Sequence, residues 1–342
     1  MKKYISSLII STALLSACSA DNSSNAQQTP EVTTAYKVSR TITAPDGGYD
    51  YISVDHAANQ LFVGRDNGIM TVDLATGKTT TLLERADVAA VLLIPDTDLM
   101  LSTNNDSNDA TILNRKTGAV IADIKTGDGP DGAFFEEKSG LIFVMNGHSE
   151  DVTVINPATA EVLATIPVGG KPEAANADGK GHVFVNVEDT NEIAVISTAS
   201  LTVAKRYALP DCDEPTGMAY DPVTGLIISV CHNNIAKLIE AETGRNHGNI
   251  KIGSIADGSI FNPETRIGYV SCIDGTLTVY HLDTEGNATV LQTIKTADGA
   301  RTEAYDPIAD ELYLPAAHVE WGPDGEYMGA EKEFKVVVVS QN

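Results

Sequence analysis

The 342-residue chain is acidic and poor in aromatic side chains. Its 47 aspartates and glutamates outnumber its 23 lysines and arginines, for a net charge of −24. Such a field repels phosphate backbones, so no nucleic-acid partner is expected, and it keeps a monomer soluble while attracting cations. Beyond the N-terminus no apolar run is long enough to span a bilayer, which excludes a transmembrane-helix protein.

Residues 1–17 predict a lipoprotein signal peptide. Lys2 and Lys3 form a charged start, residues 8–15 are apolar, and small residues precede Cys18. This arrangement matches a secretory signal and resembles the lipobox of bacterial lipoproteins. The alternative is an ordinary secretory signal with an incidental cysteine.

Lipidation of Cys18 would place the protein in the cell envelope, held to the membrane by its lipid anchor alone. Residues 18–34 are rich in Ser, Asn and Gln without apolar periodicity, which predicts a flexible tether. The resemblance to bacterial lipoproteins implies that Ser19 favours sorting to the periplasmic side of the outer membrane in a Gram-negative cell, with the cell surface as the other candidate location.

Residues 35–342 contain seven repeats of about 42 residues, a period typical of propeller blades. Each repeat has a short apolar strand at its centre; these are residues 61–63, 100–102, 142–144, 183–185, 227–229, 267–270 and 312–314. Turns such as residues 221–225 precede most of them, and a second apolar strand follows. Because each blade buries its faces only against its neighbours, the sequence predicts a single all-β, seven-bladed β-propeller.

The third repeat illustrates the four strands expected in each blade. Alternating apolar and polar residues predict strands near 133–135, 141–145, 152–155 and 161–168. The last repeat ends after residues 335–339, which have the pattern of a third strand. We therefore expect the N-terminal strand at residues 36–43 to complete the last blade and close the ring.

A family resemblance supports this fold. Residues 164–172 (ATIPVGGKP), 182–186 (HVFVN) and 193–196 (IAVI) resemble the YVTN repeat of YncE-like seven-bladed propellers. The resemblance spans residues 36–342; the second repeat departs from it, and the seventh carries a long insertion. It implies the fold strongly and the function weakly, because members include binding proteins, surface-layer proteins and relatives of enzymes.

Acidic residues recur at the first position of the innermost strand, where the repeats face the central channel. This position holds Asp50, Asp131, Glu173, Thr216, Asp257 and Arg301, with Asp87 or Ala89 in the second repeat. Together with side chains on nearby loops they predict a ligand-binding rim: Asp50, Arg65, Asp131, Glu173, Glu214, Asp257, Arg301, Glu303 and Trp321. Converging carboxylates raise one another's pKa unless a cation joins them, so we expect a cation, a small cationic ligand or a protein loop there. The alternative is a hydrated acidic funnel.

Three histidines fall on loops of the same rim: His148, His232 and His318. Histidine is a common metal ligand and acid or base, so these residues predict either a zinc or copper site or a catalytic group. Their separation around the ring argues against a shared site, and the alternative is that they are exposed polar residues of the loops. No role is assigned to the other four histidines, among them His182 and His247.

The remaining cysteines are Cys212, Cys231 and Cys272. A Cys212–Cys231 disulfide suits an oxidising envelope, whereas Cys231, His232 and Cys272 could instead form a soft metal cluster. No compact spacing of cysteines supports a metal.

The insertion at residues 318–329 carries the only tryptophan, Trp321, and reads as an irregular loop that could cover the channel. No CxxCH haem motif, phosphate-binding glycine loop or nucleophile elbow is present, and a quinone cofactor is not expected with one tryptophan.

These features favour a non-enzymatic binding or scaffold lipoprotein. The alternatives are a lyase-like or lactonase-like propeller enzyme that uses the rim histidines and carboxylates, and a periplasmic metal-binding protein or metallochaperone. An enzyme requires histidine and carboxylate within hydrogen-bond reach across one concave pocket, whereas a scaffold does not.

Overall fold

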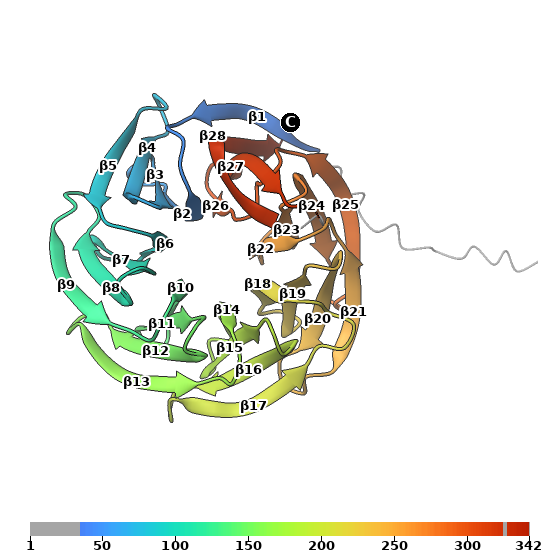
Figure 1. Cartoon of the computed structure of the whole chain (residues 1–342). Coiled ribbons are helices and arrows are strands. Elements are labelled where there is room, and N and C mark those ends of the chain that lie inside the picture. The colour runs from blue at the N-terminus through green and yellow to red at the C-terminus, as the bar shows by residue number, and fades with distance from the viewer. Residues whose placement is uncertain (1–34, 324–326, 342) are drawn as a thin grey trace, which may run out of the picture. The chain divides into compact units, whose positions relative to one another are not determined.

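The computed structural model describes residues 35–323 and 327–341, and these form seven four-stranded antiparallel blades in a ring around a central channel (Figure 1). The predicted signal peptide at residues 1–17, the lipidation site Cys18 and the tether at 18–34 lie outside the described residues. No helix in the described ranges is long and apolar enough to cross a membrane.

The two inner strands of each blade surround the channel. The innermost strands of blades 1 to 7 are β2 (Tyr49–Asp55), β6 (Val88–Leu93), β10 (Pro130–Glu136), β14 (Pro172–Ala177), β18 (Pro215–Asp221), β22 (Ala256–Asn262) and β26 (Ala304–Asp306). The second strands are β3 (Gln60–Arg65), β7 (Leu99–Asn104), β11 (Leu141–Asn146), β15 (His182–Val187), β19 (Leu226–Cys231), β23 (Ile267–Cys272) and β27 (Glu311–Trp321).

The two outer strands complete each sheet. The third strands are β4 (Gly68–Asp73), β8 (Asp109–Asn114), β12 (Asp151–Asn156), β16 (Glu192–Ser197), β20 (Ile235–Glu240), β24 (Thr276–Leu282) and β28 (Tyr327–Gln341). The outermost strands are β5 (Thr79–Glu84), β9 (Val120–Lys125), β13 (Glu161–Pro167), β17 (Thr202–Ala208), β21 (Asn246–Lys251), β25 (Ala288–Lys295) and β1 (Tyr36–Thr43). The seven-bladed propeller predicted from the repeats is confirmed.

The turns between first and second strands explain the recurrent aspartates of the repeats. The Asp221 carboxylate accepts the backbone N–H groups of Val223 at 3.0 Å and Thr224 at 3.2 Å. Asp306 does the same for the two backbone N–H groups that follow Pro307. These side chains imitate a backbone turn and reverse the chain within a few residues.

Hydrogen bonds from buried asparagine side chains hold the second and third strands in register in blades 2 and 3. The Asn146 side-chain amide donates to Asp151 at 2.7 Å and to Thr153 at 2.9 Å. Asn104 repeats this pattern with Asp109 and Thr111. Because burying an amide without a hydrogen-bond partner destabilises the fold, each asparagine favours one register of its strand pair.

Strand β1 closes the ring, as expected from its sequence. It pairs antiparallel with β28, from Tyr36 opposite Gln341 to Thr43 opposite Lys335, and lies at the outer edge of blade 7 (Figure 1). The order of that sheet is β1-β28-β27-β26, so the two ends of the propeller share one blade. Pairing with β1 covers the edge of β28, which would otherwise be an exposed strand edge.

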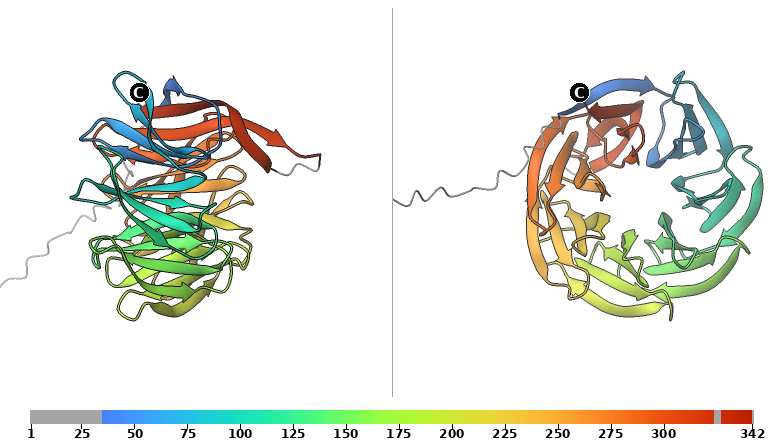
Figure 2. Two further views of the ribbon diagram at one scale, coloured as in Figure 1. Left: turned by 60° about the vertical axis from the view of Figure 1, so that its left-hand side comes forward. Right: turned by 180° about the vertical axis from the view of Figure 1, so that it is seen from behind.

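The insertion in blade 7 is a β-hairpin, so the prediction of an irregular loop is wrong. The β27–β28 ladder continues beyond Ala316, which faces Lys335, as far as Trp321, which faces Tyr327. In the left view of Figure 2 this hairpin extends beyond the neighbouring blades and away from the ring. Hydrogen bonding to a regular partner strand orders a segment whose sequence lacks a clear period.

Phe334 anchors the closing blade. Its side chain is 1% exposed, and its ring centroid lies 5.1 Å from that of Tyr49 in blade 1. The Arg65 guanidinium carbon lies 4.0 Å from the centroid of the Phe334 ring. Phe334 is therefore one of the buried side chains that pack the seam between the last and first blades.

We predict that Phe334→Ala lowers the free energy of unfolding by about 3–5 kcal/mol, since it opens a cavity in a fully buried contact. Urea unfolding followed by circular dichroism measures this change. The control Ile308→Ala in the same blade, where the side chain is 73% exposed, should change stability by less than about 0.5 kcal/mol. Equal effects of the two substitutions would contradict this role for Phe334.

Candidate functional site: the acidic central channel

The structure places one rim residue from each blade at an equivalent position beside the channel. These residues are Asp50, Ala89, Asp131, Glu173, Thr216, Asp257 and Arg301, so the second blade contributes Ala89 rather than Asp87. In blade 3 the ladder pairs Pro130 with Asn146 and resumes at Ala133, which leaves Asp131 within a bulge. Such bulges re-aim side chains, and the first six blades share this irregularity at the start of the inner strand.

Hydroxyl groups on neighbouring blades hold the channel residues in place. Thr103 donates to the Asp131 carbonyl at 2.6 Å, and Thr302 donates to the Asp50 carbonyl at 2.9 Å. Each bond crosses from one blade to the next, so the spacing of the channel residues follows from the packing of the blades.

Arg301 bridges two of the carboxylates. Its guanidinium lies 3.2 Å from Asp50 of blade 1 and 3.7 Å from Asp257 of blade 6, and it donates to the Tyr49 carbonyl at 3.0 Å. Blade 7 thus supplies the cation that lies between the acids of its two neighbours.

Lys171 supplies a second cation that the sequence analysis missed. Its ammonium lies 3.5 Å from Glu173 and also forms an ion pair with Glu188. Burial opposes the charged form, but Glu173 and Glu188 raise the pKa of Lys171 above its usual value. The signal was the loop before β14, where a lysine stands two residues from the glutamate that faces the channel.

Four of the channel acids have pKa values above their usual range. Burial, aided by repulsion from Asp50, raises the pKa of Asp131 to about 7. Burial also raises the pKa of Glu303 to about 8, although a hydrogen bond from Ser271 works against the shift. Burial also raises the pKa values of Asp50 and Glu173. The positive charges of Arg301 and Lys171 therefore do not fully offset the cost of burying these carboxylates.

A cavity of about 170 Å³ opens beside these acids. Its lining includes Tyr51, Asp257, Ser259 and Glu303. The Ser259 hydroxyl and one Glu303 oxygen are buried and have no hydrogen-bond partner among the described residues. Unsatisfied buried polar atoms at a cavity wall indicate a place for a ligand or ordered water.

Glycine makes this cavity possible. A Cβ atom on Gly258 would overlap with the Glu303 carboxylate, and one on Gly217 would lie 2.5 Å from the Asp257 carbonyl oxygen. The inner strands can approach the acids this closely only without a side chain at these positions.

The three rim histidines are not brought together. They lie in blades 3, 5 and 7, and none of them lines the channel cavity or the larger groove between blades 4 and 5. Within residues 35–323 and 327–341, no three histidine, cysteine or acidic side chains are placed to hold a metal ion. His318 lies within β27 rather than on a loop, and its side chain is exposed.

His232 pairs with a carboxylate of its own blade and not with another histidine. Its Nδ1 lies 2.6 Å from the Glu214 carboxylate at the rim of blade 5. Cys212 and Cys231 form a disulfide that ties the loop carrying Glu214 to β19. Cys231 therefore has no thiolate to offer a metal, and burial raises the pKa of the free thiol of Cys272.

Two other residues predicted to line the rim, Arg65 and Trp321, lie away from the channel acids. Arg65 is 3% exposed and donates to the carbonyls of Gly48 at 2.7 Å, Pro45 at 3.0 Å and Gly47 at 3.1 Å. It organises the loop between β1 and β2 instead of facing the channel. Trp321 is 47% exposed at the end of β27, in the projecting hairpin.

No family model and no curated protein matches this chain. Solved structures do match it. The U3-55K structure covers 87% of this chain and 97% of its own, at 11% identity and a TM-score of 0.73. The structure of the RRP9 WD40 repeats covers 90% of this chain and 100% of its own, at 11% identity and a TM-score of 0.75.

The hydrazine synthase of Kuenenia stuttgartiensis covers 82% of this chain and 96% of its own, at 16% identity and a TM-score of 0.69. The likeness is one of fold. At these identities the propeller is shared, and the channel chemistry must be argued from the residues of this chain.

The raised pKa values predict a pH-dependent stability. Between the usual carboxyl range near pH 4 and about pH 8, the folded channel retains protons that the unfolded chain releases, so stability falls as the pH rises through this window. Asp131→Asn removes one contributor, and the loss of stability between about pH 5 and pH 8 should shrink by at least about 1 kcal/mol.

Urea unfolding at several pH values tests this expectation. The exposed Asp128→Asn, on the loop before β10, makes the same charge change outside the channel and should leave the pH dependence as in the unaltered protein. Parallel curves for Asp131→Asn and the unaltered protein would exclude the buried titration of Asp131.

Proposed function

We propose that this protein is a cell-envelope lipoprotein that binds a small organic cation in its propeller channel without catalysing a reaction. The observation that carries the proposal is the partnerless Glu303 oxygen on a cavity wall shared with Asp257 and Ser259. A cationic donor at this point would satisfy the buried acceptors and offset the repulsion that raises the pKa values of the channel acids.

The spacing of the acids favours an organic cation over a metal ion. A hard metal ion needs several oxygens converging at about 2.0–2.6 Å. No three acidic, histidine or cysteine side chains within the described ranges are placed in this way. An extended ammonium or guanidinium donates several separate hydrogen bonds and can reach carboxylates that lie too far apart to ligate one ion.

The size of the cavity sets the size of the group. At about 170 Å³ it is close to an engineered cavity of about 150 Å³ that holds benzene. It therefore suits the head of a ligand, such as a guanidinium or alkylammonium group, rather than an entire large molecule.

A binding role also agrees with what lines the cavity. None of the three rim histidines is among its lining residues, so no histidine stands ready there as an acid or base. The YVTN-like motifs support kinship with YncE-like propellers, and the residues before Cys18 support lipidation and an envelope location.

We predict that agmatine binds the channel and releases protons, because its positive charge lowers the pKa values of Asp131 and Glu303. Isothermal titration near pH 7 in buffers of different ionisation enthalpy measures both quantities. Asp257→Asn/Glu303→Gln should weaken binding at least about tenfold, whereas Asp128→Asn should not. Absence of binding at about 10 mM, or binding without proton release, would rule the proposal out.

A separate measurement addresses the anchor. Expressed in a Gram-negative host, the unaltered chain should lose residues 1–17, gain the mass of a lipid and partition into detergent. Cys18→Ser should gain no lipid mass, because the sulfur that would be acylated is gone. Identical mass shifts and partitioning of the two proteins would contradict lipidation of Cys18.

A further inference from the structure

A larger groove lies on the face opposite to the channel rim. It has a volume of about 570 Å³, within the range of about 300–1,000 Å³ typical of small-molecule sites. Blade 4 forms one wall, through the β14–β15 turn and β17, and blade 5 forms the other, through the β18–β19 and β20–β21 turns. In an antiparallel blade these turns lie at the end of the sheet away from the rim loops.

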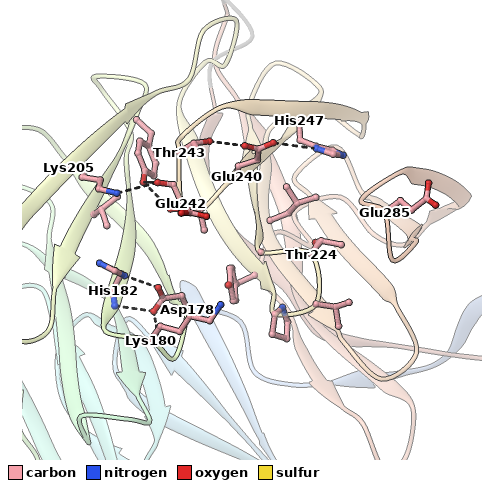
Figure 3. Close-up of a pocket in the computed structure, with 18 residues that line it drawn as sticks. Asp178, Lys180, His182, Lys205, Thr224, Glu240, Glu242, Thr243, His247 and Glu285 are labelled. Carbon is pink, nitrogen blue, oxygen red and sulfur yellow. Dashed lines mark hydrogen bonds and ion pairs between the residues drawn. The ribbon is translucent and has the colours of Figure 1, made fainter.

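The blade 4 wall is basic. Lys180, His182 and Lys205 lie on one side of the groove in Figure 3. Asp178 orients His182, with its carboxylate 2.8 Å from Nδ1, and Lys205 donates to the Glu242 carbonyl at 3.2 Å. The Lys180 ammonium has no hydrogen-bond or ion-pair partner among the residues that the structure describes, although the protein as a whole is strongly acidic.

The opposite wall is acidic. Glu240 and Glu285 lie across the groove from Lys180 in Figure 3, Glu285 on the β24–β25 turn of blade 6, and Glu242 of the β20–β21 turn lies beside Lys205. Arg245 already neutralises Glu240, with its Nε 3.0 Å from the carboxylate. Within the described ranges, the carboxylates of Glu242 and Glu285 take part in no ion pair. Charges of both signs thus face one cavity without pairing with each other.

Apolar side chains form the floor between these walls. Tyr207 and Leu226 are 7% and 1% exposed, and Val195 and Tyr220 join them in the lining. The Tyr207 hydroxyl donates to the Ala241 carbonyl at 2.9 Å, which joins blade 4 to the turn that carries Glu242. Packing and hydrogen bonding therefore hold the floor of the groove in place.

We propose that this groove binds a zwitterionic small molecule of the amino-acid or short-peptide class. Its carboxylate lies at Lys180 and Lys205, its ammonium lies across the groove at Glu285, and its apolar part lies on the Tyr220 side of the floor. A ligand with both charges satisfies both walls, whereas an anion or a cation alone satisfies one and meets repulsion from the other. The site shares no residue with the channel cavity and does not depend on the function proposed for it.

Titration of the mature chain with the dipeptide L-alanyl-L-leucine, followed by saturation-transfer NMR and calorimetry, tests the site. We expect a Kd of about 1 mM or tighter. Its N-acetylated and C-amidated analogues, each lacking one charge, should bind at least about tenfold more weakly. Equal binding of the three compounds, or no binding at about 10 mM, would overturn the proposal.

Matched variants locate the binding. Lys180→Gln/Lys205→Gln removes two exposed charges from the groove and should weaken dipeptide binding at least about tenfold. Lys78→Gln/Lys138→Gln removes two exposed charges from turns of blades 1 and 3 on the same face and should leave binding unchanged. All four side chains are exposed, so both proteins should fold, which unchanged thermal unfolding verifies. Equal affinity of the two variants would place the ligand elsewhere.

Discussion

Ring closure is the constraint on which the rest of the structure depends. Tyr36 and Gln341, at opposite ends of the propeller, face each other across the β1–β28 pair, and the Gln341 amide donates to the Tyr36 hydroxyl at 3.0 Å. Such a distant pairing gains nothing until the intervening blades are in place, because the entropy of closing a long loop must be met first. Once it forms, seven inner strands converge, and only then does the channel exist.

Convergence also gives the channel its chemistry. A carboxylate at one strand start is an ordinary solvated group in an isolated blade, but the ring brings Asp50, Asp131, Glu173 and Asp257 together in restricted space. Arg301 and Lys171 compensate part of this charge, and protonation of Asp131 and Glu303 compensates more. A protein that tolerates such repulsion keeps a site that a cation can stabilise, which is typical of functional positions.

The two candidate sites use the propeller in different ways. The channel depends on equivalent positions in successive blades, so it belongs to the ring as a whole. The groove between blades 4 and 5 depends on differences between turns, since lysines stand on one wall and unpaired glutamates on the other. Because blades contact only their neighbours, the turns of one blade pair can diverge without disturbing the ring.

The sequence by itself determined the blades, their turns and the closing strand, because period-two alternation and turn residues act locally and repeat seven times. It also identified the acidic positions of the channel, since equivalence follows from register. Only the tertiary structure decided that the blade 7 insertion is a hairpin, that Arg65 is buried against Phe334, and that Lys171 joins the channel. The groove, too, was invisible in the sequence. These features depend on which side chains from separate blades come within a few ångströms of one another, and spacing along the chain carries no such information.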